Sequence, residues 1–339
     1  MKFIKHLFIL TLIAFIAAGC SESERINIYS ARHYDTDIEL YERFTEQTGI
    51  EVNLIEGGSD ELIERIDSEG INTPADMLIT VDAGRLWRAK EAGIFQAHGS
   101  EMLDTAIPEY LQDRDNMWVG LSKRVRGIVY HSERVTPEEL AGYQQLTDEQ
   151  WDDRICIRSS NNIYNQSLVA SMIESRGTEE TQTWAEGLVA NFARDPQGGD
   201  TDQIRAVAAG QCDIAIVNHY YLARLMASDD AADQEVAEAV GMYFPPEEHG
   251  GTHVNISGAG ITANAPNKEN AITFLEFLVT EEAQRIYAVA NNEFPIIEEM
   301  ELPEVLSSFG RFESDAVNVS SYGENNPEAI RLMDRAGWK

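Results

Sequence analysis

Residues 25–81 read RINIYSARHYDTDIELYERFTEQTGIEVNLIEGGSDELIERIDSEGINTPADMLITV. This stretch alternates strand-like runs rich in β-branched and aliphatic residues with runs whose apolar residues recur near helical spacing. Its expected elements are, in order, Arg25–Ser30 (strand), Asp35–Gly49 (helix), Ile50–Ile55 (strand), Ser59–Gly70 (helix) and Asp76–Val81 (buried strand). Strands that alternate with helices in this way predict an α/β fold with a largely parallel sheet.

The same alternation continues along the rest of the chain. Further strand-like runs lie at Trp118–Val129, Cys156–Ile157, Cys212–Val217 and Ile256–Thr262. Helical patterns follow at Ala83–Ala92, Ser167–Arg176, Thr178–Phe192, Asp202–Ala209, Leu222–Met226 and, as one long stretch, Lys268–Ala290. A chain of 339 residues suits two domains better than one simple core. Because no Gly/Ser-rich linker, internal repeat or low-complexity tract separates them, we expect ordered strands to join the two domains.

The first twenty residues have the pattern of an export signal. Two lysines in Met1–Lys5 precede an apolar run at Leu7–Ala18, and small residues lead to Cys20. The apolar run is short for a membrane helix, which needs about 20 apolar residues. The small-residue ending resembles a bacterial lipobox, with Ala17 where leucine is usual. We therefore expect residues 1–19 to be a lipoprotein signal peptide and Cys20 to be the lipidated N-terminus; the alternative is simple cleavage with Cys20 unmodified.

Charge and motifs exclude several classes of function. The formal net charge of −32 argues against nucleic-acid binding, because phosphates would be repelled. We find no Gly-x-Ser-x-Gly elbow, P-loop, Gly-x-Gly-x-x-Gly turn or His-Glu-x-x-His helix, and the seven histidines lack zinc-like spacing. No activated nucleophile or acid–base pair is evident. The sequence therefore predicts a binding protein in preference to a hydrolase or transferase.

Two cysteines remain once Cys20 is assigned to the signal. In an exported protein, an oxidising compartment makes a Cys156–Cys212 disulfide the natural expectation. Such a bridge would stabilise the fold by about 4 kcal/mol in the chain-entropy model. The alternative is a pair of buried thiols.

Two tyrosine-bearing segments stand at the carboxyl ends of predicted strands. His33 and Tyr34 follow the first strand, and Tyr220 and Tyr221 follow the strand Cys212–Val217. Ligands of open α/β sheets bind at these strand ends. On the first turn of a helix, neighbouring side chains diverge by only about 100°. Each segment can therefore direct two adjacent side chains toward one point.

Clustered phenol groups suit a hard, highly charged cation. Tyrosine ionises near pH 10 in water, so several phenolates at neutral pH need strong positive charge close by. A metal ion supplies that charge and displaces the protons. Fe³⁺ fits by hardness and oxygen preference. The alternatives for Tyr220 and Tyr221 are packing in a core or stacking on an organic ligand.

Several segments together resemble the ferric-iron-binding family of ABC importer solute-binding proteins, in the family's order. They are Ile28–Tyr34 (IYSARHY), Val119–Arg126 (VGLSKRVR), Arg158–Ser167 (RSSNNIYNQS) and Gly210–Arg224 (GQCDIAIVNHYYLAR). The resemblance implies a type II periplasmic-binding-protein fold of two lobes, each a mixed, largely parallel sheet flanked by helices, joined by a two-strand hinge. We expect residues 24–120 plus 243–295 in the N-lobe and 121–242 plus 296–339 in the C-lobe.

The resemblance also implies a set of iron ligands. Tyr220 and Tyr221 match the family's tandem tyrosines, Tyr164 a third tyrosine ligand, Tyr34 the N-lobe tyrosine of the tyrosine-rich subgroup, and His33 its occasional histidine ligand. Another subgroup uses a His and a Glu from the N-lobe with a phosphate-type anion, but tyrosine beside histidine here favours the tyrosine-rich version.

Two arginines, Arg124 and Arg224, match family arginines that lie beside the ligands without binding the metal. Four tyrosinates outweigh the three charges of Fe³⁺ by one, and an arginine would offset that excess. Carbonate as an added anion would make the site more negative and is disfavoured. Structural salt bridges are the alternative role of both arginines. The role of His219 has no explanation at this level.

The expected function is extracytoplasmic capture of ferric iron for an ABC importer, with a permease and its ATPase as partners. The protein would be a monomer, periplasmic or at the cell surface, and held to the membrane through Cys20. Fe²⁺ remains open as a second oxidation state of the cargo. The same fold could instead bind a small organic cation, or a phosphonate or thiamine-type ligand.

Overall fold

The computed structural model describes residues 24–339 except 33, 35 and 298–299. The predicted signal peptide, Cys20 and His33 therefore lie outside the described residues. Strands in this part of the chain form one mixed sheet of nine: β1 (Arg25–Ser30), β2 (Glu51–Glu56), β3 (Met77–Val81), β4 (Phe95–Gln96), β5 (Val119–His131), β6 (Ile155–Cys156), β7 (Ile214–Asn218), β8 (Val240–Tyr243) and β9 (His253–Thr262).

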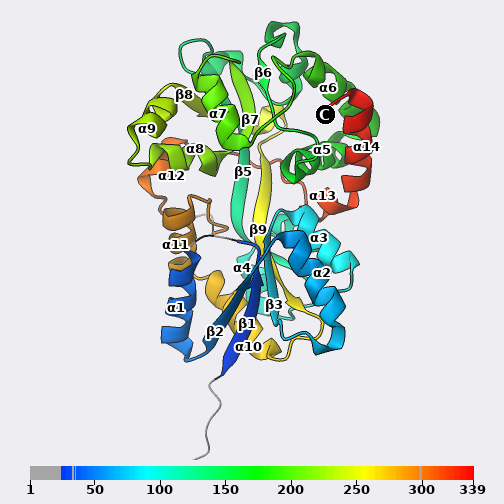
Figure 1. Ribbon diagram of the computed structural model, residues 1–339, viewed down its shortest axis with the longest axis vertical. Helices are drawn as coiled ribbons and strands as arrows, with labels where there is room; N and C mark the ends of the chain where they lie inside the picture. The colour runs from blue at the N-terminus through cyan, green and yellow to red at the C-terminus, as the bar shows by residue number, and fades with distance from the viewer. Residues whose placement is uncertain (1–23, 33, 35, 298–299) are drawn as a thin grey trace, which may run out of the picture.

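Helices cover the sheet throughout and fall into two groups by position (Figure 1). One group follows or packs around the first strands: α1 (Asp37–Thr48), α2 (Ser59–Glu69), α3 (Ala83–Glu91), α4 (Glu101–Ala106), α10 (Lys268–Leu278) and α11 (Glu281–Asn291). The other surrounds β6 and β7: α5 (Ile163–Arg176), α6 (Thr178–Ala190), α7 (Asp200–Ala208), α8 (His219–Met226), α9 (Ala231–Glu238), α12 (Glu304–Ser308), α13 (Ser320–Glu324) and α14 (Asn326–Ala336).

The sheet runs in the order β2-β1-β3-β9-β5-β7-β6. At one end β1 pairs in parallel with β2 and β3, and at the other end β6 pairs in parallel with β7. Between them β5 and β9 pair with each other antiparallel, from Val119 opposite Ala259 to Arg126 opposite His253. The sheet is mixed, as predicted, but the expectation that it is largely parallel is wrong. The two long strands β5 and β9 pair antiparallel with each of their neighbours, and only β1 with β2, β1 with β3 and β6 with β7 pair in parallel among the described strands.

Two lobes are visible in Figure 1, with the long strands β5 and β9 passing from one to the other. We call the lower lobe, which contains β1 to β3 and the first helix group, the N-lobe. The upper lobe, which contains β6 to β8 and the second group, is the C-lobe. The fold is the predicted two-lobed one. The residue boundaries of the lobes given above stay a prediction.

One predicted helix is wrong in its extent. The stretch Lys268–Ala290 was expected to be continuous, but it divides into α10 and α11 at Val279 and Thr280. The Thr280 hydroxyl accepts a hydrogen bond from the Ala283 amide and so caps a new helix. Apolar periodicity alone does not reveal this break, because buried residues recur near helical spacing on both sides of it.

The Cys156–Cys212 disulfide is present, as predicted. It links β6 to the residue two positions before β7. Both sulfurs lie in a small apolar cluster of the C-lobe that includes Ile204, Val207 and Val217. The bridge therefore fastens together the part of the C-lobe from which Tyr220 and Tyr221 arise.

No helix in the described part of the chain combines the length and the apolar character that crossing a membrane requires.

Candidate functional site

Tyr220 and Tyr221 lie in the first turn of α8, directly after β7. Asn218, at the end of β7, has an extended backbone and precedes the helix. The helix begins at His219, three residues before the predicted Leu222, so both tyrosines belong to it. Their ring centroids are 4.5 Å apart. Tyr220 is fully buried, whereas Tyr221 is half-buried, so Tyr221 is the member of the pair that is partly accessible to solvent.

Tyr164 comes from the first turn of α5, a second helix start in the C-lobe. The side chain of Asn162 accepts a hydrogen bond from the Tyr164 amide at 3.1 Å and fixes the beginning of this helix. The guanidinium carbon of Arg158 lies 5.4 Å from the centroid of the Tyr164 ring. Arg158 is itself held by Asp200 at 3.0 Å. All three C-lobe tyrosines therefore stand at helix N-termini, where the helix dipole favours anionic oxygen.

Arg124 on β5 joins two of these tyrosines. Its guanidinium donates hydrogen bonds to the Tyr164 hydroxyl, at 3.1 Å, and to the Tyr220 hydroxyl. Its side chain is almost fully buried. One guanidinium therefore holds two phenol oxygens from different helices within reach of a common point. Positive charge at this distance favours the phenolate form of Tyr220.

Tyr34 approaches from the N-lobe, on the segment between β1 and α1. The guanidinium carbon of Arg224, on α8 of the C-lobe, lies 4.9 Å from the Tyr34 ring centroid and 5.0 Å from that of Tyr220. Arg32 lies 4.8 Å from the Tyr34 ring. Arg224 thus contacts tyrosines of both lobes. The structure brings together all four predicted tyrosines and both predicted arginines.

Tyr34 differs from Tyr220 and Tyr221 in how readily it loses a proton. Burial raises the pKa of Tyr220 well above its usual range, although Arg124 opposes this. Burial, with Tyr164 adding to it, raises the pKa of Tyr221 to about 12. Burial also raises the pKa of Tyr34, but Arg124, Arg32 and Arg224 together outweigh it and the net shift is downward. A cation must therefore displace protons chiefly from the C-lobe pair.

Glu293 is a site residue that the sequence did not indicate. Its fully buried carboxylate accepts hydrogen bonds from Arg124 at 2.5 Å and Arg32 at 3.0 Å, and from Ser122 on β5 and Ser257 on β9. Burial alone would raise its pKa, but the two arginines and the hydrogen bonds lower it to about 2. The carboxylate therefore stays ionised and aligns both arginines behind the tyrosines.

No local signal could have identified Glu293. The residue follows Asn291 and Asn292 in an irregular segment, and its partners are distant in sequence. A bridge between Lys123 and Phe294 pairs this segment with β5.

His219 also has a structural explanation. Its Nδ1 accepts a hydrogen bond from the Val125 amide at 3.1 Å, which leaves Nε2–H to donate to the Asn292 carbonyl at 2.9 Å. Burial lowers the pKa of His219 to about 4, so the ring stays neutral. The residue fastens the start of α8 to β5 and to the segment that carries Glu293.

Comparison with known proteins identifies the family of the chain. The family described as bacterial extracellular solute-binding protein matches residues 39–312. Iron uptake protein A1 of Synechocystis sp. is 52% identical over 324 residues, which are 96% of this chain and 90% of that protein.

Solved structures give the same grouping. A structure of the Trichodesmium protein IdiA (FutA), in complex with iron and citrate, has a TM-score of 0.91 and 56% identity, covering 93% of this chain and all of that one. A ferric binding protein from Campylobacter jejuni has a TM-score of 0.85 and 38% identity, covering 93% of this chain and 100% of that one. The chain belongs to the bacterial extracellular solute-binding protein family, in the group that includes these iron uptake and ferric-binding proteins.

Proposed function

We propose that this protein captures Fe³⁺ between its lobes through the phenol oxygens of Tyr34, Tyr164, Tyr220 and Tyr221, and delivers it to an ABC importer. The single observation that carries the proposal is the convergence of these four rings around Arg124 and Arg224. The printed functions of the relatives, iron uptake and ferric binding, support the same cargo.

The chemistry of the donor set suits a hard trivalent cation. Phenolate oxygens are hard ligands, and binding the ion compensates the cost of removing protons from the buried pair. Arg124 and Arg224 offset the negative charge that four phenolates leave over. His33 is proposed as a fifth ligand, and the excess of negative charge disfavours carbonate. The site takes Fe³⁺ in preference to Fe²⁺, because a divalent ion would leave a larger uncompensated charge.

The division of the tyrosines between the lobes gives the sequence of events. The ion first meets Tyr164, Tyr220 and Tyr221 on the C-lobe. The lobes then close about β5 and β9, and Tyr34 completes the shell and excludes water. The closed form is recognised by the permease, and the ATPase drives release. The protein acts as a monomer in this cycle.

The cargo is tested by loading the protein with ferric citrate and removing unbound iron. Phenolate bound to Fe³⁺ should give a visible charge-transfer band with one iron per chain. A protein that remains colourless after loading contradicts the proposal. Calorimetry with thiamine and with a phosphonate then tests the two organic cargoes that the sequence left open.

We also propose that the chain is exported and anchored to the membrane through lipidated Cys20. The support is the short basic start, the apolar run and the small residues before that cysteine. Mass spectrometry of the mature N-terminus should find residues 1–19 removed and Cys20 acylated. A free, unmodified N-terminus at Cys20 contradicts the anchor and leaves export intact.

A further inference from the structure

Asp82 lies between β3 and α3 of the N-lobe in an unusual backbone conformation. Its φ is 77° and its ψ is 122°, a region that residues other than glycine rarely adopt. The side chain caps α3 by accepting a hydrogen bond from the Gly84 amide at 2.9 Å. Capping alone does not require this conformation, because N-cap residues are normally extended. Other contacts of Asp82 must therefore offset the free energy that the strained backbone costs.

Two of those contacts lead out of the N-lobe. The hydroxyl of Ser167, on α5 of the C-lobe, donates a hydrogen bond to Oδ1 of Asp82 at 2.7 Å. The side-chain amide of Asn255, on β9, donates to Oδ2 at 2.8 Å. All three side chains are buried. Within the described part of the chain no cation pairs with Asp82, so its carboxyl group depends on these neutral donors.

The backbone of Asp82 is also attached to β9, one of the two strands that pass between the lobes. Its amide donates a hydrogen bond to the Ile256 carbonyl at 2.9 Å, and the Ala83 amide donates to the Asn255 side chain at 2.9 Å. Atoms close to a hinge move least when the lobes rotate. We therefore expect Asp82 to keep its partners in the open and the closed protein.

Both side-chain partners of Asp82 adjoin residues of the proposed iron site. Ser167 follows Tyr164 by three residues on α5, and residues three apart are neighbours on the surface of a helix. Asn255 lies opposite Arg124 where β9 pairs with β5. Arg124 donates a hydrogen bond to the Tyr164 hydroxyl at 3.1 Å. Asp82 therefore contacts, from the N-lobe, the helix that carries Tyr164 and the strand beside Arg124.

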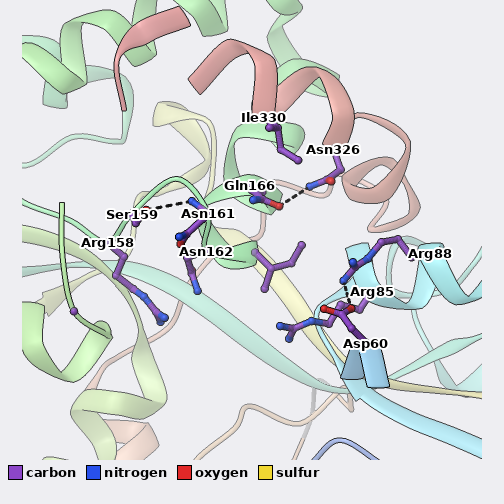
Figure 2. Close-up of a pocket in the computed structure, with 12 residues that line it drawn as sticks. Asp60, Arg85, Arg88, Arg158, Ser159, Asn161, Asn162, Gln166, Asn326 and Ile330 are labelled. Atoms are coloured by element: carbon purple, nitrogen blue, oxygen red, sulfur yellow. Dashed lines mark hydrogen bonds and ion pairs between the residues drawn. The ribbon is translucent and has the colours of Figure 1, made fainter. Parts of the chain in front are cut away.

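The starts of α3 and α5 face each other across a cavity, with Arg85 on one side and Gln166 on the other (Figure 2). Ser167, the next residue, does not line the cavity and is fully buried. A Cβ on Gly84 of α3 would lie 3.4 Å from the Ile163 side chain of α5, so the two helices are in direct contact. The hydrogen bond from Ser167 therefore lies inside this contact, where water does not compete for it.

We propose that Asp82 is a positioning residue of the iron site, which fixes Tyr164 on the opposite lobe through Ser167. The proposal rests on the iron ligands proposed above. A ligand group has to stay within about 0.5 Å of its productive position, and neighbours that lock its rotamer and its helix provide that precision. Asp82 does not touch the metal. It holds the start of α5 against β9 and β5, so that Tyr164 and Arg124 reach the same point.

The test is a double-mutant cycle on iron-loaded, full-length mature protein. Ser167→Ala should speed iron release to an excess chelator about tenfold, the factor expected for losing a hydrogen bond to a carboxyl group. In a Tyr164→Phe background the same change should alter release by less than about twofold, because the phenol oxygen that Ser167 helps to position is already gone. Ser171→Ala is the matched control: it removes a buried hydroxyl one turn along α5 whose hydrogen bond, to the Leu168 carbonyl, stays within the helix.

Asp82→Asn tests the carboxyl group itself. In either orientation it places an amide nitrogen against a donor, the Gly84 amide or the Asn255 side chain, and iron release should become faster than in the wild-type protein. Asp67→Asn, at an exposed aspartate on α2, should leave the rate unchanged. Release from Asp82→Asn at the rate of this control contradicts the proposal.

Crystal structures of iron-free Ser167→Ala and Ser171→Ala give a second measurement that needs no metal. The Tyr164 hydroxyl should leave hydrogen-bonding range of Arg124 in the first variant and keep its 3.1 Å contact in the second. The proposal is overturned if the contact is kept in both, or if Ser167→Ala speeds release by the same factor with and without the Tyr164 hydroxyl. A wild-type protein without a charge-transfer band contradicts the iron proposal instead, and the two crystal structures then decide the role of Asp82.

Discussion

The two lobes contribute to the site in different ways. The C-lobe presents three tyrosines from the first turns of α5 and α8, and Arg124 already bonds to two of them. The N-lobe contributes Tyr34 from a segment between β1 and α1, held by stacking against arginines. One side is built on helix starts and the other on a connecting segment.

This contrast indicates that capture and closure are separate tasks. Side chains at packed helix starts are positioned before the ligand arrives, which lowers the entropic cost of binding. A side chain on a connecting segment can adjust as the lobes approach. The C-lobe should therefore determine whether iron binds, and the N-lobe how long it stays.

The largest expected effect comes from removing phenol groups of the C-lobe. Tyr220→Phe combined with Tyr221→Phe should abolish the charge-transfer band and reduce iron affinity by several orders of magnitude. Tyr34→Phe should keep a weakened band and mainly speed iron release to an excess chelator. Absorbance titration and release kinetics measure both. Equal losses in the two variants would contradict the division of tasks between the lobes.

Removing the disulfide tests whether iron binding by the C-lobe tyrosines depends on the rigidity of that lobe. Cys156→Ser with Cys212→Ser removes a link between residues 56 positions apart, and should lower the free energy of unfolding by about 4 kcal/mol. Iron release should change little if the tyrosines are held mainly by Arg124 and His219. Urea denaturation measures the free energy of unfolding, and an unchanged unfolding midpoint would show that the disulfide does not stabilise the fold.

Glu293 pairs with Arg32 of the N-lobe and with Arg124 on β5, so replacing it should affect both stability and iron binding. Glu293→Gln leaves Arg124 buried without its carboxylate and Arg32 with Asp37 alone, which should cost about 3 kcal/mol of stability and weaken iron binding as well. Glu281→Gln, an exposed glutamate on α11, is the control. A variant as stable as the control would show that the two arginines do not need this carboxylate.

Glu293 should also make the free energy of unfolding depend on pH. The folded pKa of Glu293, about 2, lies below the usual value near 4.3, so its stabilising contribution is complete above about pH 4.3. That contribution should fall as the pH drops from there toward 2. The stability difference between the wild-type protein and Glu293→Gln should narrow over this window in denaturation measurements. A constant difference down to pH 2 would contradict the depressed pKa.

The smallest expected effect concerns the contact across the lobes. Arg224→Gln removes stacking on Tyr34, Tyr220 and Tyr221, which is worth about 1 kcal/mol, or about fivefold in the rate of iron release. Arg331→Gln, an exposed arginine on α14, should leave the rate unchanged. If both variants release iron at the wild-type rate, Arg224 does not join the lobes.

Sequence pattern predicted much of this molecule because the relevant information is local. Strands such as β1 follow from β-rich composition, and the tyrosines stand out because they directly follow strands. Glu293 and His219 could not be interpreted in that way, since their meaning comes from β5 and β9 meeting a distant irregular segment. The division between α10 and α11 was missed because a single threonine cap decides it.

The most direct test of the split site is a crystal structure of the iron-loaded protein with an anomalous map at the iron edge. The account predicts one iron peak bonded to the phenol oxygens of Tyr164, Tyr220 and Tyr221 from the C-lobe and of Tyr34 from the N-lobe. An iron peak away from these oxygens, or one bound by C-lobe tyrosines alone in a closed molecule, would contradict it.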